Sequence, residues 1–274
     1  MVTGSMALEG TEVMAAESDV PWAFRSGEHV CWLVRSSAEY DVGERDLLAR
    51  AAFAGESVMI VGDRVRTRHN APGASGDVDV WVGRDGLAVL EVMREQAHTV
   101  DLAGRGLRIL AQMEHLAPPD ARLEDLIACE IDVAEVAGLG ATSVVCAYRR
   151  SAWKRELLSG VSAVHSRLVG MGQDAAGFRI ARVGADAWAL HGVIGFEAAG
   201  SFAAALRALL SRSAHLRLHC AGLELIDAAG WYALVAAATG IPGTAVLLEQ
   251  VNDTVATAWR LSGYEGTTPV QVRT

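Results

Sequence analysis

The chain has 274 residues, 51% of them hydrophobic and 21% charged, with 24 Lys and Arg against 33 Asp and Glu. This length allows two domains of ordinary size, and the composition is typical of a globular protein rather than a disordered one. The formal net charge of −9 comes without a basic face, which argues against a partner held through nucleic-acid phosphates. The cationic run at residues 64–69 is interpreted as a solvated loop.

The sequence also indicates the cellular compartment of the protein. No apolar run reaches the roughly 18 residues that a membrane-spanning helix needs, and the N-terminus does not resemble a signal peptide. We therefore expect a cytoplasmic protein. Cys31, Cys129, Cys146 and Cys220 are far apart and form no Cys-x-x-Cys pair, so they are predicted to be free thiols.

Residues 1–21 show no sustained hydrophobic period and are predicted to be a flexible leader. From there to residue 168 strands and helices alternate. Strands are predicted at residues 29–34, 57–62, 77–82, 107–112 and 142–148, and helices at residues 39–54, 87–102, 123–137 and 153–168. Such alternation predicts an α/β domain, residues 22–168, with a largely parallel sheet covered by helices on both faces.

The glycine-rich residues 169–176 suit a linker, and residues 177–274 are predicted to be a second, smaller α/β domain. Its predicted elements are a hairpin at residues 178–183 and 187–192, strands at 216–220, 245–249 and 270–273, and helices at 197–211, 228–239 and 254–261.

Residues His219–Gly230 follow one of these strands and open a helix, and their sequence resembles the signature of STAS domains, the family of anti-sigma-factor antagonists. The later residues Val251-Asn252 and Trp259–Gly263 also fit the family's order. The resemblance implies a STAS-type domain that binds an anti-sigma factor or a related kinase-like protein. In the family a Ser or Thr after the aspartate is phosphorylated, whereas here Asp227 is followed by Ala228 and Ala229. It therefore implies a module that is not switched by phosphorylation there.

The predicted start of the helix at residues 227–232 has features that do not depend on the resemblance. Asp227 is predicted to cap the helix with its carboxylate, and Gly230 either to let the backbone turn or to let a neighbouring element approach closely. The free amides at the start of the helix would offer a docking edge. Trp231 and Tyr232 are read either as interface anchors or as residues that pack against the sheet or against the first domain. His219, where the family has an aspartate, is interpreted as structural.

The first domain resembles the MEDS family of sensory domains, whose core is similar to RecA- or KaiC-like ATPases. The resemblance covers about residues 22–168 and depends on the order and spacing of several motifs. These are residues 29–33, 55–63, 106–113 and 144–150, together with Glu130 and His165. It implies a cytoplasmic sensor for a small organic ligand, with a layered α/β sheet.

The candidate ligand-binding residues are His29, Cys31, Asp63, Glu130, Cys146, Tyr148, Arg149 and His165. Side chains two residues apart on a strand share a face, so His29 and Cys31 would meet Cys146 and Tyr148 if their strands are neighbours. Asp63 and Arg149 are expected at the rim, at the carboxyl ends of strands. A cysteine in an apolar strand can equally be plain core. Metal binding by a set of His and Cys residues is conceivable. Since the spacing lacks a local metal-ligand pair of the Cys-x-x-Cys kind, neither a metal nor another cofactor is predicted.

No Gly-x-x-x-x-Gly-Lys-Ser/Thr motif follows the strand that ends at Gly62, so nucleotide hydrolysis is not expected. The segment from Asp63 to Asp77 is also shorter than in the MEDS family, where a further helix is expected.

The leading hypothesis is thus a non-enzymatic sensor-transducer that tunes transcription through an anti-sigma factor. The alternative is a ligand-binding or structural protein whose second domain mediates dimerisation or contacts in cis. The residue types would also allow an enzyme with Cys31 or Cys146 as nucleophile and His29 as base, but no sequence motif supports this hypothesis.

Overall fold

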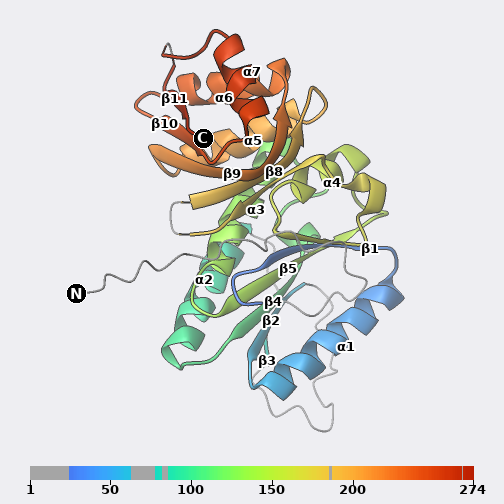
Figure 1. Cartoon of the computed structure of the whole chain (residues 1–274). Helices are drawn as coiled ribbons and strands as arrows, with labels where there is room; N and C mark the ends of the chain where they lie inside the picture. Colours follow the sequence, from blue (N-terminus) through green and yellow to red (C-terminus); the bar gives the residue numbers. More distant parts are fainter. Residues whose placement is uncertain (1–24, 63–77, 82–85, 185–186, 267) are drawn as a thin grey trace, which may run out of the picture.

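The structure is a computed structural model that describes residues 25–62, 78–81, 86–184, 187–266 and 268–274. They form two stacked lobes, each built on its own sheet (Figure 1). The described part of the N-terminal lobe has a parallel six-stranded sheet in the order β3-β2-β4-β5-β1-β6. Its strands are β1 (His29–Val34), β2 (Ser57–Val61), β3 (Val78–Trp81), β4 (Leu107–Gln112), β5 (Thr142–Arg149) and β6 (Arg167–Val169).

Helices cover both faces of this sheet, which is what a parallel sheet of apolar strands requires. One face packs against α1 (Ser37–Ala54) and the other against α2 (Gly86–Leu102), α3 (Leu123–Ala137) and α4 (Arg155–Ser162). Alternate residues of β1 divide between the faces: Val30 and Trp32 lie on the α1 side, and Cys31 and Leu33 lie on the side of α2, α3 and α4. The predicted α/β layered fold is confirmed.

The segment at residues 153–168 differs from its prediction as one helix. Instead, α4 ends at Ser162 and the chain turns, so that Arg167–Val169 forms β6 beside β1. Ser166 secures this turn: its backbone NH donates to His29 O (2.9 Å), and its hydroxyl oxygen accepts from the His29 NH (3.0 Å). A helix through this segment would have left the edge of β1 without backbone partners, which a buried strand does not tolerate.

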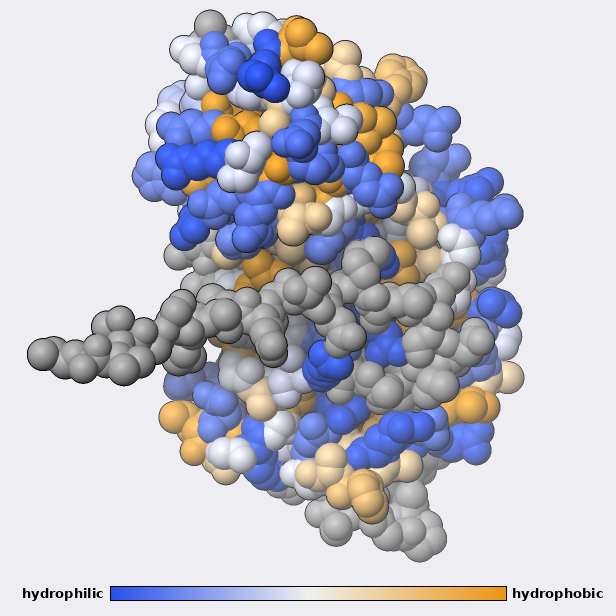
Figure 2. All heavy atoms as spheres, in the orientation of Figure 1, coloured by the Kyte–Doolittle hydropathy of each residue, from blue (hydrophilic) through white to orange (hydrophobic). Residues whose placement is uncertain are grey.

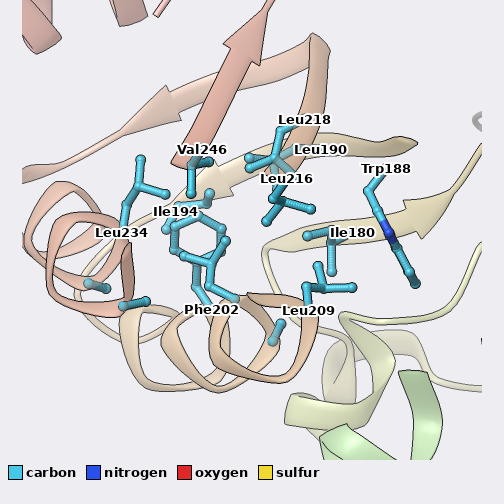
Figure 3. Close-up of a cluster of buried hydrophobic side chains, with 14 of the residues drawn as sticks. Ile180, Trp188, Leu190, Ile194, Phe202, Leu209, Leu216, Leu218, Leu234 and Val246 are labelled. Carbon is cyan, nitrogen blue, oxygen red and sulfur yellow. The ribbon is translucent and has the colours of Figure 1, made fainter. Parts of the chain in front are cut away.

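The C-terminal lobe has a five-stranded sheet in the order β11-β10-β9-β8-β7. Its strands are β7 (Phe178–Arg182), β8 (Ala187–Ile194), β9 (His215–Ile226), β10 (Ala245–Glu249) and β11 (Val270–Val272). β7 and β8 form the predicted antiparallel hairpin, whereas the other neighbours are parallel. Figure 3 shows Phe202 and Leu234 pointing toward sheet residues such as Val246. They belong to α5 (Ala199–Leu210) and α6 (Ala228–Gly240), and α7 (Asp253–Leu261) completes the lobe.

The strand predicted at residues 216–220 is much longer in the structure, because β9 continues to Ile226. Its register against β8 shifts twice, between Ala189 and His191 and between Gly192 and Val193. These irregularities break the period-2 pattern on which the sequence prediction depended. As a result β9 runs almost to Asp227, the residue that caps α6.

The two lobes share one apolar core rather than meeting through polar surfaces. Ile127, Ile131 and Ala134 of α3 belong to the same buried cluster as Phe202 and Leu206 of α5. Ion pairs between α3 and the C-terminal lobe lie beside this apolar contact. Arg212 Nη2 lies 2.7 Å from Asp132 Oδ1, and Arg207 Nη2 lies 3.7 Å from Glu124 Oε1.

Residues near the junction also join the two lobes through the backbone. Ile180 NH donates to Ala163 O at 2.6 Å, and Ala176 NH donates to Ser162 Oγ at 2.8 Å. Elsewhere in the fold, no helix among the described residues is both long and apolar enough to span a membrane.

Two glycines in the first turns of helices provide a matched test of packing. A Cβ on Gly230 would lie 2.6 Å from Ile226 Cγ1 and 3.0 Å from Ile194 O, whereas a Cβ on Gly200 would meet nothing within 4 Å. The close approach predicted at Gly230 is thus confirmed. We expect Gly230→Ala to lower the free energy of unfolding by about 1–3 kcal/mol because it overpacks the core. Gly200→Ala should leave it unchanged or raise it slightly. Urea unfolding measures both; equal effects would contradict this packing.

Candidate ligand site and docking edge

Polar side chains from four separate segments meet inside the N-terminal lobe, between the sheet and α3. β1 and β5 are neighbours with Cys31 opposite Cys146, so the adjacency on which the predicted site depended is confirmed. His29 comes from β1, Glu130 from α3, Cys146 and Tyr148 from β5, and His165 from the turn before β6. All five side chains are buried: Glu130 and His165 are 0% exposed and His29 is 4% exposed. We call these five residues the Glu130 cluster.

The carboxylate of Glu130 is the centre of this cluster. Its Oε1 accepts from the Tyr148 hydroxyl. Its Oε2 lies 3.0 Å from His29 Nε2, 3.3 Å from Cys146 Sγ and 3.3 Å from His165 Nε2. His29 Nε2 also lies 3.2 Å from Cys146 Sγ. Three side chains thus converge on one carboxylate oxygen.

Backbone carbonyls orient both imidazole rings. His29 Nδ1 lies 3.2 Å from Val164 O, and His165 Nδ1 lies 2.7 Å from Val161 O. Because a carbonyl oxygen only accepts, each Nδ1 must carry the hydrogen of its bond. In a neutral ring the Nε2 then bears a lone pair, and both Nε2 atoms point toward Glu130 Oε2. The centroids of the two rings lie 3.9 Å apart, and their planes are tilted by 30°.

Burial controls the ionisation of these groups. It is the main cause that lowers the pKa of His29 to about 4, and the neighbouring His165 lowers it further. The pKa of Glu130 is lowered: burial opposes this, but His165 and His29 outweigh it. Burial first, and then the charge of Glu130, raise the pKa of Cys146 and of Tyr148. Glu130 is therefore an anion beside a neutral imidazole, a thiol and a phenol.

The remaining candidate residues lie apart from the cluster. Cys31 is buried on the same face of β1, and its Sγ is 3.8 Å from Met171 Sδ. Arg149 was expected at the rim of the site, but its side chain is 55% exposed and pairs with Glu114 at 3.0 Å. The reason is the strand alternation, which points Arg149 away from its neighbour Tyr148. Asp63 and the shortened segment after it lie outside the described residues.

The Glu130 cluster is solid core rather than the wall of an open pocket. The described surface has one groove of about 290 Å³ between the lobes, lined by residues that include Arg94, Trp188 and Arg212. A second groove, of about 330 Å³, is lined by residues that include Phe178 and His191. Neither groove includes a residue of the Glu130 cluster.

The start of α6 in the C-terminal lobe has the geometry that the sequence predicted. Asp227 caps the helix through a 2.9 Å bond in which Gly230 NH donates to its Oδ1. Ala228 is exposed, and Ala229 is partly buried. Of the two aromatic candidates, Tyr232 is 67% exposed, whereas Trp231 is 2% exposed. The ring centroids of Trp231 and Trp259 lie 5.0 Å apart. Trp231 therefore belongs to the core, and only Tyr232 remains available as an anchor.

Three further apolar side chains near this edge were missed by the sequence analysis. Phe196 is 82% exposed, Leu225 is 41% exposed and Val193 is 38% exposed. Val193 and Leu225 are partners across β8 and β9, and Ile194 O accepts from the Asp227 NH at 3.0 Å. We call Val193, Phe196, Leu225, Ala228 and Tyr232 the α6 patch. Each residue by itself is unremarkable in sequence: strand pairing places Val193 beside Leu225, and Ala228 and Tyr232 are one helical turn apart on α6.

His219, the other departure from the STAS pattern, lies on β9 with Nδ1 3.7 Å from Glu249 Oε2. It is therefore tied to the neighbouring strand β10, which agrees with the structural role expected for it.

Comparison with known families identifies the N-terminal lobe. Residues 28–166 match the family MEDS, described as the MEthanogen/methylotroph, DcmR Sensory domain. The match covers just over half of the chain. The chain belongs to the MEDS family. His29, Glu130, Cys146, Tyr148 and His165 all fall within the matched residues. No match to a STAS domain accompanies it, so the STAS resemblance of residues 177–274 stays a prediction. No curated protein is similar enough to count as a match.

The hydrogen bond from Tyr148 to Glu130 gives a direct test of the Glu130 cluster. Tyr148→Phe would leave a buried carboxylate oxygen without its donor, so we expect the free energy of unfolding to fall by about 1.5–3 kcal/mol. Tyr232→Phe removes the hydroxyl of an exposed tyrosine and should change it by less than about 0.5 kcal/mol. Urea unfolding followed by circular dichroism checks both; a silent Tyr148→Phe would mean that Glu130 is not held as described.

Proposed function

We propose that this MEDS protein is a non-enzymatic sensor-transducer. Its N-terminal lobe receives the input at the Glu130 cluster, and its C-terminal lobe, a STAS-like module, binds an anti-sigma factor through the α6 patch. The observation that carries the proposal is the position of α3. This helix presents Glu130 to the cluster on one side and packs Ile127 and Ile131 against the C-terminal lobe on the other.

The contact between the lobes supports a transfer of signal from the cluster to the patch. Ala163 and Val164, which precede His165, belong to the same apolar core as α5 and α6. Because packed cores respond to a displaced side chain by shifting their neighbours, a change at Glu130 or His165 would reach α5 directly. Within that core, α5 also packs on α6, whose first turn carries Ala228.

The α6 patch has the properties of a protein-docking surface. Exposed apolar side chains lie on α6 itself, on β9, which leads into it, and at the end of the neighbouring strand β8, and aromatic residues such as Phe196 and Tyr232 contribute most where partners dock. On the face shown in Figure 2, hydrophobic side chains reach the surface of the C-terminal lobe among hydrophilic ones. Since Ala228 has no hydroxyl, control by phosphorylation at this position is excluded chemically, and the input would come from the N-terminal lobe.

A nucleophilic role for the cysteines has little support. Cys31 and Cys146 are both 0% exposed, and burial raises the pKa of each thiol well above its usual value. A catalytic cysteine needs a lowered pKa and access for its substrate. The buried thiols therefore favour a sensory site over a catalytic one.

The alternative function, a C-terminal lobe that works in cis, is favoured by a specific observation. The core shared by α3 and α5 means that this lobe already covers one side of the N-terminal lobe. However, the α6 patch does not take part in that contact, because Phe196 and Tyr232 remain exposed. A surface left open in this way would be the place for self-association or for the anti-sigma factor.

Phe196→Ser tests the proposed docking surface. We expect at least a tenfold weaker affinity for an anti-sigma factor that binds the wild-type chain, because an apolar anchor is lost. Phe53→Ser is the matched control, since Phe53 is 96% exposed on α1 in the other lobe. Isothermal titration calorimetry against a panel of anti-sigma kinases measures binding, and light scattering detects self-association. If no kinase binds the wild type and Phe196→Ser abolishes a homodimer, the alternative function is correct.

Ala228→Asp tests the helix start separately. The new carboxylate would lie at the N-terminal end of α6, where the helix dipole favours negative charge. The free energy of unfolding should therefore change by no more than about 0.5 kcal/mol. Partner affinity should fall at least tenfold, because docking would bury that charge. Ala38→Asp, at an exposed position in the first turn of α1 in the other lobe, is the control that adds the same charge to another helix start. Equal binding by all three chains would place the docking surface elsewhere.

A further inference from the structure

We infer that the Glu130 cluster is a binding site for a single divalent transition-metal ion of the zinc class, held by His29 Nε2, Glu130 Oε2, Cys146 Sγ and His165 Nε2. This inference rests on the proposed function only where it makes the ion part of the sensory input. It replaces the expectation from sequence that the chain binds no metal.

The distances between the donor atoms fit one ion. All four atoms lie within 4.8 Å of one another. Atoms bound at about 2.0–2.3 Å to a tetrahedral ion lie roughly 3.3–3.6 Å apart. The separations of His29 Nε2, Cys146 Sγ and His165 Nε2 from Glu130 Oε2 are 3.0–3.3 Å. To reach tetrahedral spacing, these three atoms would need to move away from Glu130 Oε2 by only a few tenths of an ångström.

The hydrogen bonding of the two rings supports the same conclusion independently. His165 Nε2 is fully buried and has no hydrogen-bond partner, although it lies 3.3 Å from Glu130 Oε2. With Nδ1 of each ring donating to a backbone carbonyl, Nε2 is the ring nitrogen left to face Glu130 Oε2. In the neutral ring, each Nε2 carries a lone pair that a metal ion between the four donor atoms would bind. A ligating histidine in proteins usually donates its other ring NH in this way.

Charge balance also favours a divalent ion. Binding would displace the Cys146 proton to solvent, leaving a thiolate and the Glu130 carboxylate beside two neutral imidazoles. These two negative charges neutralise a 2+ ion, so the occupied site carries no net charge into the core. Tyr148, which donates to Glu130 Oε1, would remain as the partner that orients the carboxylate. The mixed nitrogen, sulfur and oxygen donors suit zinc and neighbouring transition metals and not magnesium or calcium.

The closed packing favours an ion over an organic molecule as the direct occupant. The four donor residues are 0–4% exposed, and neither of the two grooves described above includes any of them. An ion needs only the space between its donors, whereas an organic ligand needs a cavity of its own. Entry would require folding around the ion or local opening of the turn that carries His165.

Cobalt(II) is the probe for this site, because its visible and near-ultraviolet spectrum reports tetrahedral geometry and thiolate ligation. We expect the untagged, metal-depleted full-length chain to bind one equivalent of Co²⁺ with a thiolate-to-cobalt band that Zn²⁺ removes. Cys146→Ser should abolish the band and weaken affinity at least tenfold. Cys220→Ser changes an equally buried thiol in the other lobe and should keep both. An unchanged band in Cys146→Ser overturns the inference.

X-ray absorption at the zinc edge of the wild-type chain makes the test independent of whether a variant folds. Two nitrogen, one oxygen and one sulfur ligand are expected; uptake of no ion, or ligation without sulfur, overturns the site. The outcomes for the proposed function are separate. If the ion binds but no anti-sigma factor docks, the proposed output fails and the site stands. If an anti-sigma factor docks on a chain that takes up no ion, only this inference fails.

Discussion

The buried carboxylate of Glu130 is the constraint on which much of the N-terminal lobe depends. A charged group with 0% exposure is tolerated only where partners replace its water, and each partner must be brought from another part of the chain. Tyr148 and Cys146 come from the central strand β5, His29 from β1 and His165 from the turn after α4. The turn itself is fixed by Ser166 against the backbone of His29. The same contacts that surround Glu130 therefore also fix the path of the chain around it.

α3 carries this arrangement to the rest of the molecule. Leu126, Glu130 and Val133 face the sheet, while Ile127, Ile131 and Ala134 face the C-terminal lobe. An ordinary surface helix has one apolar stripe and one polar face, and a helix apolar on both sides is one that is buried between two layers. This double packing explains why the lobes share a core. It also gives a sensory site in the first lobe a physical route to the second.

The C-terminal lobe has an exposed helix start at which no side chain offers a hydroxyl for phosphorylation. Asp227 caps the start of α6 and Gly230 packs closely against Ile194 and Ile226, whereas Ala228 offers no group to modify. The exposed Phe196 and Tyr232 remain beside it. Under the proposed function, control passes from a covalent change on this surface to the occupancy of a site in the core of the neighbouring lobe.

The sequence by itself determined the elements whose patterns are local. The bounds of β1, β4, α3 and β10 follow directly from hydrophobic periodicity, and the capping of α6 by Asp227 follows from the chemistry of one side chain. Even the meeting of His29 with Cys146 was predictable once β1 and β5 were taken as neighbours. The MEDS motifs also indicated Glu130 and His165 as candidates, although not what they contact.

Tertiary structure decided everything that depends on distant pairing. Residues 167–169 pair with the edge of β1 as a strand instead of continuing a helix. β9 continues to Ile226 through register shifts against β8. Packing against Trp259 buried Trp231 and left Tyr232 exposed. Glu130 and His165 are 35 positions apart, yet the fold directs them at one point. Local periodicity records which face of an element is apolar, but only the packing of whole elements fixes which polar groups share an interior.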